Sequence, residues 1–209
     1  MENNKEITII PLFSSPIFTI KLEEDMESLQ RVKTDYFFRN SFAEGNHNTE
    51  ETSTKVLLED FQREKEIFLN YFYFIKNEVF HYENDFEITT SWGTKSPTNS
   101  FCQFHSHKNS FFSGVFYLDD DDEAGPLEFE SFNITSREMF VNTTESNIYN
   151  SSSWKIQPSK NLLVFFPSYL HHRIGLSTSK NDRYSIAFNI FPNGKMGAHD
   201  SFVDLTINK

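Results

Sequence analysis

Two histidines separated by a single residue are the first feature of this sequence that could do chemistry. His105 and His107 lie in the segment NSFCQFHSH (99–107), whose composition predicts a β-strand. Because side chains on a strand alternate between its two faces, both imidazoles would project from one face and could bind a metal ion from one side. Neutral imidazole suits iron, zinc, copper or nickel. A His-x-His pair taken alone is more often accidental, so a metal site requires a third ligand.

A second histidine pair supplies the candidate for that third ligand. His171 and His172 begin the predicted strand HHRIGL (171–176), directly after an apolar strand that ends in Pro167-Ser168. Ligands drawn from two distant strands of a β-barrel would form a site that leaves coordination positions open. We expect one histidine of this pair to bind the metal and the other to lie at the surface.

Arg183 is the third feature. It begins the otherwise apolar strand RYSIAFNIF (183–191), and Ser185 shares its face. An arginine in apolar surroundings needs an anionic partner, and the planar guanidinium suits a carboxylate. That partner is either a bound carboxylate ligand or an Asp or Glu of the protein itself.

Short β-rich segments follow Glu87 and must position these side chains. Short strands separated by Asn, Ser, Gly and Asp turns predict a sandwich or a barrel. The predicted strands cover residues 88–94, 99–107, 111–118, 125–131, 161–167, 171–176 and 183–191. Residues 7–21 predict two further short strands around a turn. Residues 132–158, rich in Asn, Ser and Thr, indicate a lid or a mobile insertion.

Two helices are predicted before these strands. Residues 55–80 carry apolar side chains at helical spacing, and residues 23–39 show a more charged helical pattern. The apolar face of the longer helix must pack against a sheet. Helices first and strands afterwards predict an α+β fold in which the helices buttress one face of a jelly roll.

Composition and charge exclude several classes of protein. The 209 residues carry a formal net charge of −11, which would repel the phosphate backbone of a nucleic acid. The one cysteine excludes intrachain disulfides and a cysteine-rich zinc site. The sequence lacks a run of about 18 apolar residues, so no membrane span is expected, and residues 1–10 do not read as a signal peptide. We therefore expect a single-domain cytoplasmic protein without nucleic-acid or membrane partners.

Taken together, these segments resemble the Fe(II)/2-oxoglutarate-dependent oxygenases. The resemblance is strongest to a 2OG-Fe(II) oxygenase family of marine bacteria and phages, and the order and spacing are also similar to prolyl hydroxylases. It covers most of the chain and is densest from 92 to 191. The segments that carry it are His105–Ser110, Ser113–Leu118, Gly125–Phe129, Phe165–Ser168 and Arg183–Ser185.

The resemblance implies a double-stranded β-helix (jelly roll) core with N-terminal buttressing helices. The whole chain, 1–209, would be one oxygenase domain. Residues 1–86 would supply the N-terminal strands and supporting helices, 87–192 the jelly-roll core with the catalytic site, and 193–209 a C-terminal tail.

The resemblance also implies roles for individual residues. His105 matches the first iron ligand, and His172 rather than His171 matches the distal one. Arg183 matches the residue that binds the far carboxylate of 2-oxoglutarate. Tyr117 matches a tyrosine that hydrogen-bonds the same carboxylate, and Ser185 is a weaker candidate for that contact.

The sequence departs from the wider superfamily at His107, where most members carry Asp or Glu. We expect His107 to be the remaining ligand. Three neutral imidazoles would leave the ion with its full charge, which dianionic 2-oxoglutarate could offset. An alternative is that a carboxylate of the 125–131 strand, Glu128 or Glu130, completes the site.

The implied activity is hydroxylation that uses Fe(II), 2-oxoglutarate and O2 and releases succinate and CO2. The substrate would be a small molecule or a peptide, and a homodimer is left open. Two alternatives remain: a cupin-like protein that binds a metal or small ligand without turnover of 2-oxoglutarate, and a three-histidine dioxygenase. In the latter, Arg183 would bind the carboxylate of an amino-acid substrate.

Overall fold

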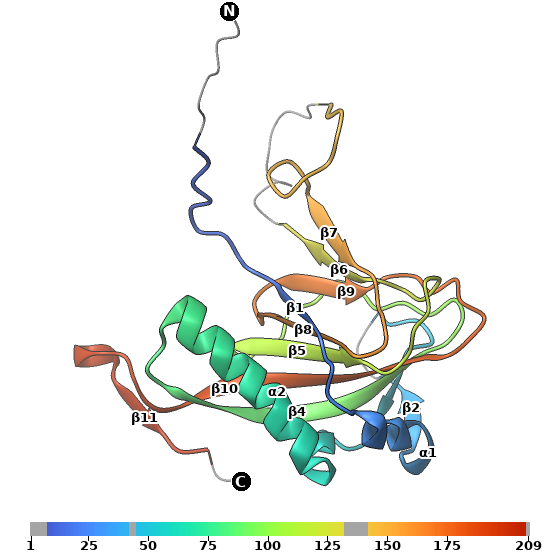
Figure 1. The fold of residues 1–209 in the computed structure, drawn as a ribbon, viewed down its shortest axis with the longest axis horizontal. Coiled ribbons are helices and arrows are strands. Elements are labelled where there is room, and N and C mark those ends of the chain that lie inside the picture. Colours follow the sequence, from blue (N-terminus) through green and yellow to red (C-terminus); the bar gives the residue numbers. More distant parts are fainter. Residues whose placement is uncertain (1–7, 42–44, 132–141, 208–209) are drawn as a thin grey trace, which may run out of the picture.

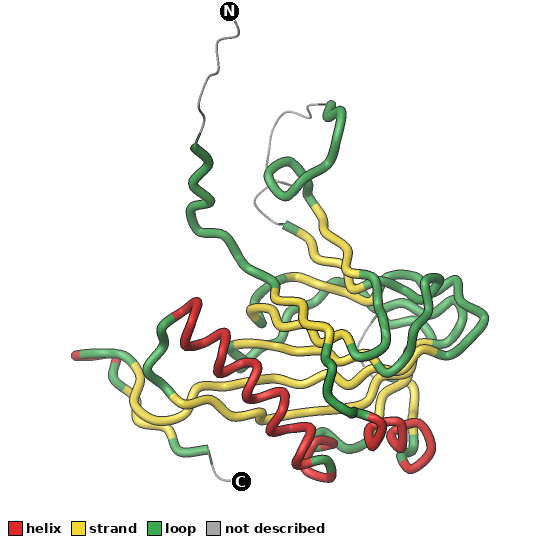
Figure 2. The backbone as a smooth tube through the Cα atoms, in the orientation of Figure 1, coloured by secondary structure: helices red, strands yellow, loops and turns green. Residues whose placement is uncertain are grey.

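The chain is built from two antiparallel β-sheets with helices packed on the outer face of the larger one (Figure 1 and Figure 2). The computed structural model describes residues 8–41, 45–131 and 142–207. The major sheet has the order β1-β8-β5-β10-β4-β3-β2, and β11 pairs with β10. Its strands are β1 (Phe18–Lys21), β2 (Phe38–Asn40), β3 (Glu50–Thr52), β4 (Asp85–Ser96), β5 (Phe112–Tyr117), β8 (Leu162–Pro167), β10 (Arg183–Met196) and β11 (Val203–Leu205).

The minor sheet has the order β7-β6-β9. Its strands are β6 (Leu127–Glu130), β7 (Ser153–Ile156) and β9 (His171–Ile174). The helical elements are the 3-10 helices η1 (Glu27–Arg31), η2 (Leu57–Asp60) and η4 (His199–Ser201), the α-helices α1 (Val32–Asp35) and α2 (Gln62–Ile75), and the π-helical turn η3 (Lys76–Phe80). No helix among the described residues is long and apolar enough to cross a bilayer.

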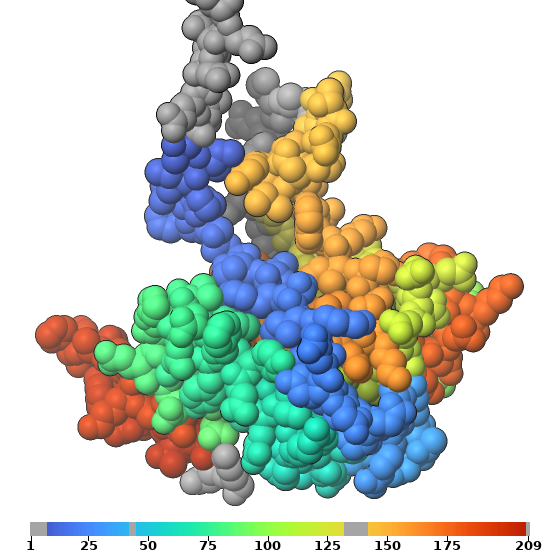
Figure 3. All heavy atoms as spheres, in the orientation of Figure 1, coloured from blue at the N-terminus to red at the C-terminus, as the bar shows by residue number. Residues whose placement is uncertain are grey.

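A phenylalanine-rich core joins α2 to the major sheet. Phe68 and Phe72 lie on the apolar face of α2 and are fully buried. The ring of Phe68 stacks on that of Phe188 in β10 with centroids 5.2 Å apart, and Phe72 lies 5.2 Å from Phe112 in β5. Each buried phenylalanine contributes about 2–3 kcal/mol of hydrophobic stabilisation. The N-terminal part of the chain, in blue and teal, covers this face of the molecule (Figure 3).

The alternation of β5 separates this outer core from the space between the sheets. Phe112 and Phe116 point towards the helix, whereas Val115 and Tyr117 point towards the minor sheet. Gly114 lies on the helix side, where a Cβ would come within 2.3 Å of the Phe188 ring. The predicted α+β arrangement, with helices on one face of a jelly roll, is therefore confirmed.

The structure corrects several predicted elements. The segment 99–107 is not a strand: only isolated bridges form there, at Phe101 and His105. Asn99 adopts a left-handed conformation, which ends any regular ladder at its start. The helix predicted over 23–39 is reduced to η1 and α1, and its last residues form β2. The helix predicted over 55–80 is α-helical only in its central part, α2.

The termini and the insertion also differ from the sequence prediction. Within residues 8–21 only β1 forms, because Pro11 and Pro16 remove backbone donors from the preceding segment. Residues 132–141 of the expected lid lie outside the described residues, and the same segment contributes β7. The C-terminal tail returns to the sheet, since Val203 to Leu205 pair with β10.

Candidate metal centre and carboxylate pocket

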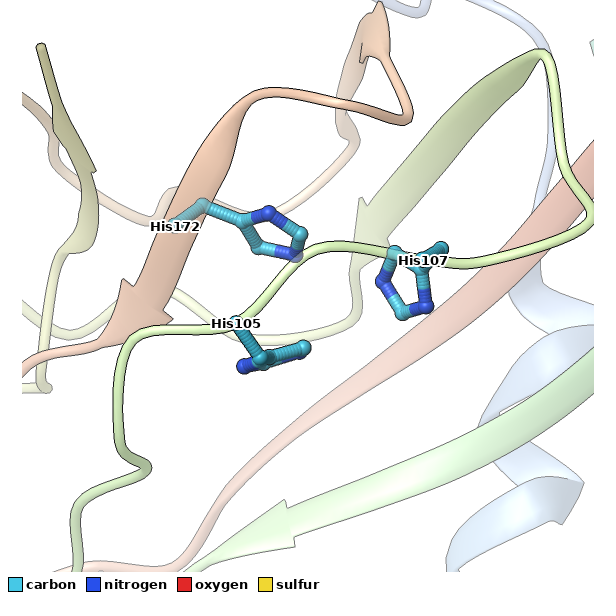
Figure 4. A group of neighbouring side chains, drawn as sticks. All are labelled: His105, His107 and His172. Atoms are coloured by element: carbon cyan, nitrogen blue, oxygen red, sulfur yellow. The ribbon is translucent and has the colours of Figure 1, made fainter. Parts of the chain in front are cut away.

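Three imidazoles converge at one point between the sheets. The nitrogen atoms of His105, His107 and His172 that could bind a metal all lie within 4.8 Å of one another. The centroid of the His105 ring is 4.5 Å from that of His172 and 5.3 Å from that of His107, and the remaining pair is 5.0 Å apart. Figure 4 shows the three rings turned towards a common centre, with His172 coming from β9 and the other two from the loop between β4 and β5.

Backbone hydrogen bonds hold the two segments in this position. His105 and His172 form an isolated antiparallel bridge in which each amide donates to the carbonyl of the other at 2.9 Å. The amide of His107 donates to the carbonyl of Ser168 at 3.0 Å. The continuous strand predicted over 99–107 is thus replaced by a loop, which is hydrogen-bonded to β9 and to the end of β8.

Two of the rings are also fixed in orientation. Nδ1 of His105 lies 2.9 Å from the carbonyl of Gln103, and Nδ1 of His172 lies 2.8 Å from the carbonyl of Leu170. Because a carbonyl oxygen only accepts, both Nδ1 atoms carry the hydrogen and donate it. Each Nε2 lone pair is therefore left for a ligand, which is how metal-binding histidines are commonly oriented.

The site favours neutral imidazole. Burial, assisted by the neighbouring His105, lowers the pKa of His107 to about 4, although the Glu51 carboxylate acts in the opposite direction. Burial also lowers the pKa of His172 to about 3, again assisted by His105. At neutral pH both rings are uncharged, which is the form that binds metal ions.

The other histidine of the second pair, His171, lies on the opposite face of β9. Its ring stacks on Phe104 with centroids 5.7 Å apart, and its Nδ1 lies 3.5 Å from the carboxylate of Glu130. Strand alternation explains the separation, because Phe129 of β6 is paired with His172 whereas Glu130 is paired with His171.

The carboxylates considered as alternative ligands point away from the three imidazoles. Glu128 binds Arg173 at 2.6 Å and Lys155 at 2.8 Å. Burial raises the pKa of Glu128, but the hydrogen bonds from these two cations outweigh it and lower the pKa overall. Both Glu128 and Glu130 are thus engaged on the outer face of the minor sheet, which argues against the alternative in which either completes the metal group.

Arg183 is a buried cation with an incomplete set of partners. Its side chain is only 1% exposed. One terminal nitrogen donates to Ser185 at 2.9 Å and the other to Ser96 at 3.0 Å, while Nε has no partner. Over the described parts of the chain, no carboxylate lies within 4.0 Å of the guanidinium, whose pKa is lowered by burial.

Tyr117 lies beside this guanidinium, with its ring centroid 5.2 Å from the central carbon of Arg183. Burial raises the pKa of Tyr117, so its hydroxyl stays protonated and can donate. Register places Tyr117 opposite Ser185 on the inner face of the major sheet. The sequence-predicted carboxylate-binding residues are therefore neighbours in the fold.

One cavity of about 320 Å³ connects the two groups. The three histidines, Tyr117, Ser185 and Arg183 all line it. Its remaining walls are largely apolar and include Val115, Leu127, Phe166, Ile174 and Phe188. A metal ion held by the imidazoles and an anion held by the guanidinium would consequently share a single cavity.

Sequence reasoning missed three polar or aromatic residues at this site: Trp92 and Glu51 line the cavity, and Ser96 contacts Arg183. Ser96 of β4 accepts a hydrogen bond from Arg183, but it belongs to none of the motifs found in the sequence. Trp92 lies with its ring centroid 5.7 Å from that of His107. Glu51 comes from β3, a strand that the composition of residues 44–54 did not predict, so no sequence signal pointed to it.

A family model described as "Putative 2OG-Fe(II) oxygenase" matches residues 90–189. The matched stretch contains the three histidines as well as Tyr117 and Arg183. A comparison with curated protein sequences finds no match.

Solved structures of 2OG-Fe(II) oxygenases share the fold. HygX from Streptomyces hygroscopicus, crystallised with nickel, 2-oxoglutarate and hygromycin B, is 12% identical with a TM-score of 0.60, over 85% of this chain and 83% of HygX. A prolyl hydroxylase from Trichoplax adhaerens, in complex with a hypoxia inducible factor peptide, is 14% identical with a TM-score of 0.60, over 84% and 83%. A prolyl-4-hydroxylase from Pseudomonas putida is 14% identical with a TM-score of 0.52, over 78% and 82%. The predicted double-stranded β-helix core is confirmed by these similarities.

Proposed function

We propose that this chain is an Fe(II)- and 2-oxoglutarate-dependent dioxygenase, because residues 90–189 match the model of the 2OG-Fe(II) oxygenases, a family of enzymes. Its substrate is a small molecule or a peptide, and hydroxylation is the reaction. The observation that carries the proposal is the buried guanidinium of Arg183, which faces the same cavity as the three histidines and has no carboxylate partner among the described residues.

The histidine group fits a divalent iron ion. His105, His107 and His172 offer three nitrogen donors, and burial keeps the latter two neutral. Imidazole is an accepted ligand for non-haem iron, and a three-ligand face leaves positions for a cosubstrate and dioxygen. Because three imidazoles bring no negative charge, the dianion of 2-oxoglutarate offsets the charge of the ion.

Arg183 fits the far carboxylate of 2-oxoglutarate. A buried cation without a counter-ion is unfavourable, so a bound anion would offset the free-energy cost of burying the guanidinium. Ser96 and Ser185 hold its two terminal nitrogens, which fixes the plane of the side chain and leaves Nε free. The protonated hydroxyl of Tyr117 is the second donor available to the same carboxylate.

When bound together, iron, 2-oxoglutarate and dioxygen supply an oxidant that hydroxylates a C–H bond while the keto acid becomes succinate and CO2. The chain itself contributes the metal ligands, orients the cosubstrate and provides apolar cavity walls. Two carbonyl-bound Nδ1 atoms keep the His105 and His172 rings in place. Arg183 and Tyr117 align the cosubstrate, and the apolar walls around Phe166 exclude water from the cavity.

The test is the visible absorption of the anaerobic protein with Fe(II) and 2-oxoglutarate. We expect a charge-transfer band, because chelation of iron by a keto acid produces one, and its absence at millimolar 2-oxoglutarate would refute the proposal. His172→Ala should abolish the band, whereas His171→Ala, on the other face of β9, should retain it. The opposite result would assign the ligand to His171.

A three-histidine dioxygenase remains the second candidate, because no carboxylate of the described residues belongs to the metal group. In that enzyme Arg183 binds the carboxylate of the substrate itself. It predicts oxygen consumption without 2-oxoglutarate and no succinate. Measuring succinate against oxygen consumed separates the two candidates. A cupin-like binding protein would give neither.

We further propose that the chain acts as one oxygenase domain in the cytoplasm. Residues 1–86 support the core, 87–192 contain the site, and 193–209 form the tail. The return of β11 to β10 and the packing of α2 on the major sheet support this division.

A further inference from the structure

An ammonium group of the protein already contacts two residues of the cavity wall. Nζ of Lys55 is 2.6 Å from Oε2 of Glu51 and 5.2 Å from the centroid of the Trp92 ring. A carboxylate on one side and an aromatic face on the other are the two groups that recognise an organic cation. Both Glu51 and Trp92 line the cavity that contains the three histidines.

Glu51 is held in place from within the fold. In register it is paired with Thr94 of β4, which also lines the cavity, so its side chain points towards the space between the sheets. Its Oε1 accepts a hydrogen bond from Ser41 at 2.8 Å, and Asn46 donates to the same serine hydroxyl at 3.0 Å. One carboxylate oxygen is thus fixed by the protein, and the other is left for a cation.

The pair lies next to the histidine group without being part of it. The Trp92 ring is 5.7 Å from that of His107, and the charge of Glu51 is felt by the same imidazole. Among the described residues, however, the candidate metal ligands are the three histidines alone. A group bound between Glu51 and Trp92 would therefore be adjacent to the reaction centre, where a substrate belongs.

We propose that Glu51 and Trp92 form a recognition site for a cationic amine of the substrate, and that Lys55 fills this site until the substrate arrives. The inference rests on the proposed function, because it takes this cavity as the active site. The substrate class is a primary amine, such as a lysine side chain or an aminated small molecule.

Lys55 is suited to leave. Its side chain is 48% exposed, and an ion pair with that access to water contributes little stability. An incoming ammonium would replace it without leaving Glu51 unpaired, and Lys55 would return to solvent. The net charge of −11 adds a long-range attraction for cations.

The experiment uses a matched pair of probes, Nα-acetyl-lysine methylamide and its neutral isostere Nα-acetyl-norleucine methylamide. Their binding is measured by calorimetry on the full chain with Zn(II) in place of iron and with 2-oxoglutarate present, so that no turnover occurs. We expect the cationic probe to bind at least 10-fold more tightly than the neutral one. Equal binding of the two probes, or no binding of the cationic probe at millimolar concentration, would overturn the proposal.

Two variants of the site should act in opposite directions. Glu51→Gln should lower the affinity for the cationic probe about 10-fold. Lys55→Met, which removes the internal competitor, should raise that affinity severalfold. Glu50→Gln is the matched control, since Glu50 pairs with Lys95 on the other face of β3 and has a similar exposure to Glu51. An unchanged affinity in Lys55→Met would show that the ion pair is only a surface contact.

The affinity for 2-oxoglutarate is measured in the same samples. It should be unchanged in Glu51→Gln and Lys55→Met, which also shows that both variants are folded. If 2-oxoglutarate does not bind to any sample while the amine preference persists, the proposed function fails and the amine site stands. If 2-oxoglutarate binds and the two probes are not distinguished, the amine site fails alone.

Discussion

Replacing Arg183 by methionine should strongly weaken ligand binding while changing the stability of the ligand-free protein little. Arg183→Met removes a guanidinium that is 1% exposed and has two serine partners, Ser96 and Ser185. A side chain that served only the architecture would, on removal, destabilise the fold. Removal of a side chain that serves a ligand would instead leave the ligand-free fold intact and weaken the binding of that ligand.

The magnitudes follow from these contacts. A carboxylate bound by charge-assisted hydrogen bonds from Arg183 is stabilised by about 3 kcal/mol, so Kd for 2-oxoglutarate should rise about 100-fold. In the ligand-free protein, two neutral acceptors lose partners at about 1 kcal/mol each. Relief of an isolated buried charge offsets this by about 1–4 kcal/mol. The ligand-free variant should therefore lie between about 1 kcal/mol less stable and about 2 kcal/mol more stable than the wild type.

Urea denaturation of the Zn(II)-loaded protein, with and without 2-oxoglutarate, measures both effects. At a concentration 100 times the wild-type Kd, the ligand should raise the free energy of unfolding of the wild type by about 2.7 kcal/mol, and that of Arg183→Met by less than about 0.5 kcal/mol. The matched control is Arg173→Met, because Arg173 pairs with Glu128 on the outer face. A loss of several kcal/mol in ligand-free Arg183→Met, with unchanged ligand stabilisation, would refute the reasoning.

Three further predictions concern the same core. Tyr117→Phe removes one hydrogen-bond donor and should raise Kd for 2-oxoglutarate about 5- to 10-fold by calorimetry, with iron affinity unchanged; an equal Kd would exclude this contact. Gly114→Ala places a Cβ 2.3 Å from the ring of Phe188 and should lower the free energy of unfolding by about 1–3 kcal/mol in urea; a neutral result would mean that the ring can shift. Folded-state pKa values of about 4 for His107 and about 3 for His172 lie below the unfolded value, so the unfolded metal-free chain binds protons first as pH falls. The free energy of unfolding of the metal-free protein should decrease by about 2 kcal/mol per histidine between pH 6.5 and 5. A free energy of unfolding that does not change over that pH range would contradict the burial of these rings.

Much of the core was predictable because its signals are local. The strands β5, β8 and β10 are short apolar runs bounded by turns, and the centre of α2 has apolar residues at helical spacing. Once strand alternation is assumed, the placement of Ser185 beside Arg183 follows from their spacing. The pairing of these strands into one sheet then brings Tyr117 to the same place.

The remaining features depend on contacts between distant parts of the chain. Segment 99–107 reads as a strand, yet its hydrogen bonds go to residues of β8 and β9 one at a time, which no local pattern specifies. The strand β3 is too short and polar to be recognised, so Glu51 could not be assigned to the cavity. That Glu128 is neutralised by Arg173 is likewise a matter of sheet register.

The reciprocal amide-to-carbonyl pair between His105 and His172 has a consequence for loading and loss of an ion. Both main chains are tied to one another independently of what their imidazoles hold, so an arriving ion finds two donors at their final separation. Amide hydrogen exchange at these two positions should be equally slow in the loaded and empty chain. His107 is held by its hydrogen bond to Ser168 instead. Loss of the ion should therefore first increase amide hydrogen exchange in the turn that follows His107.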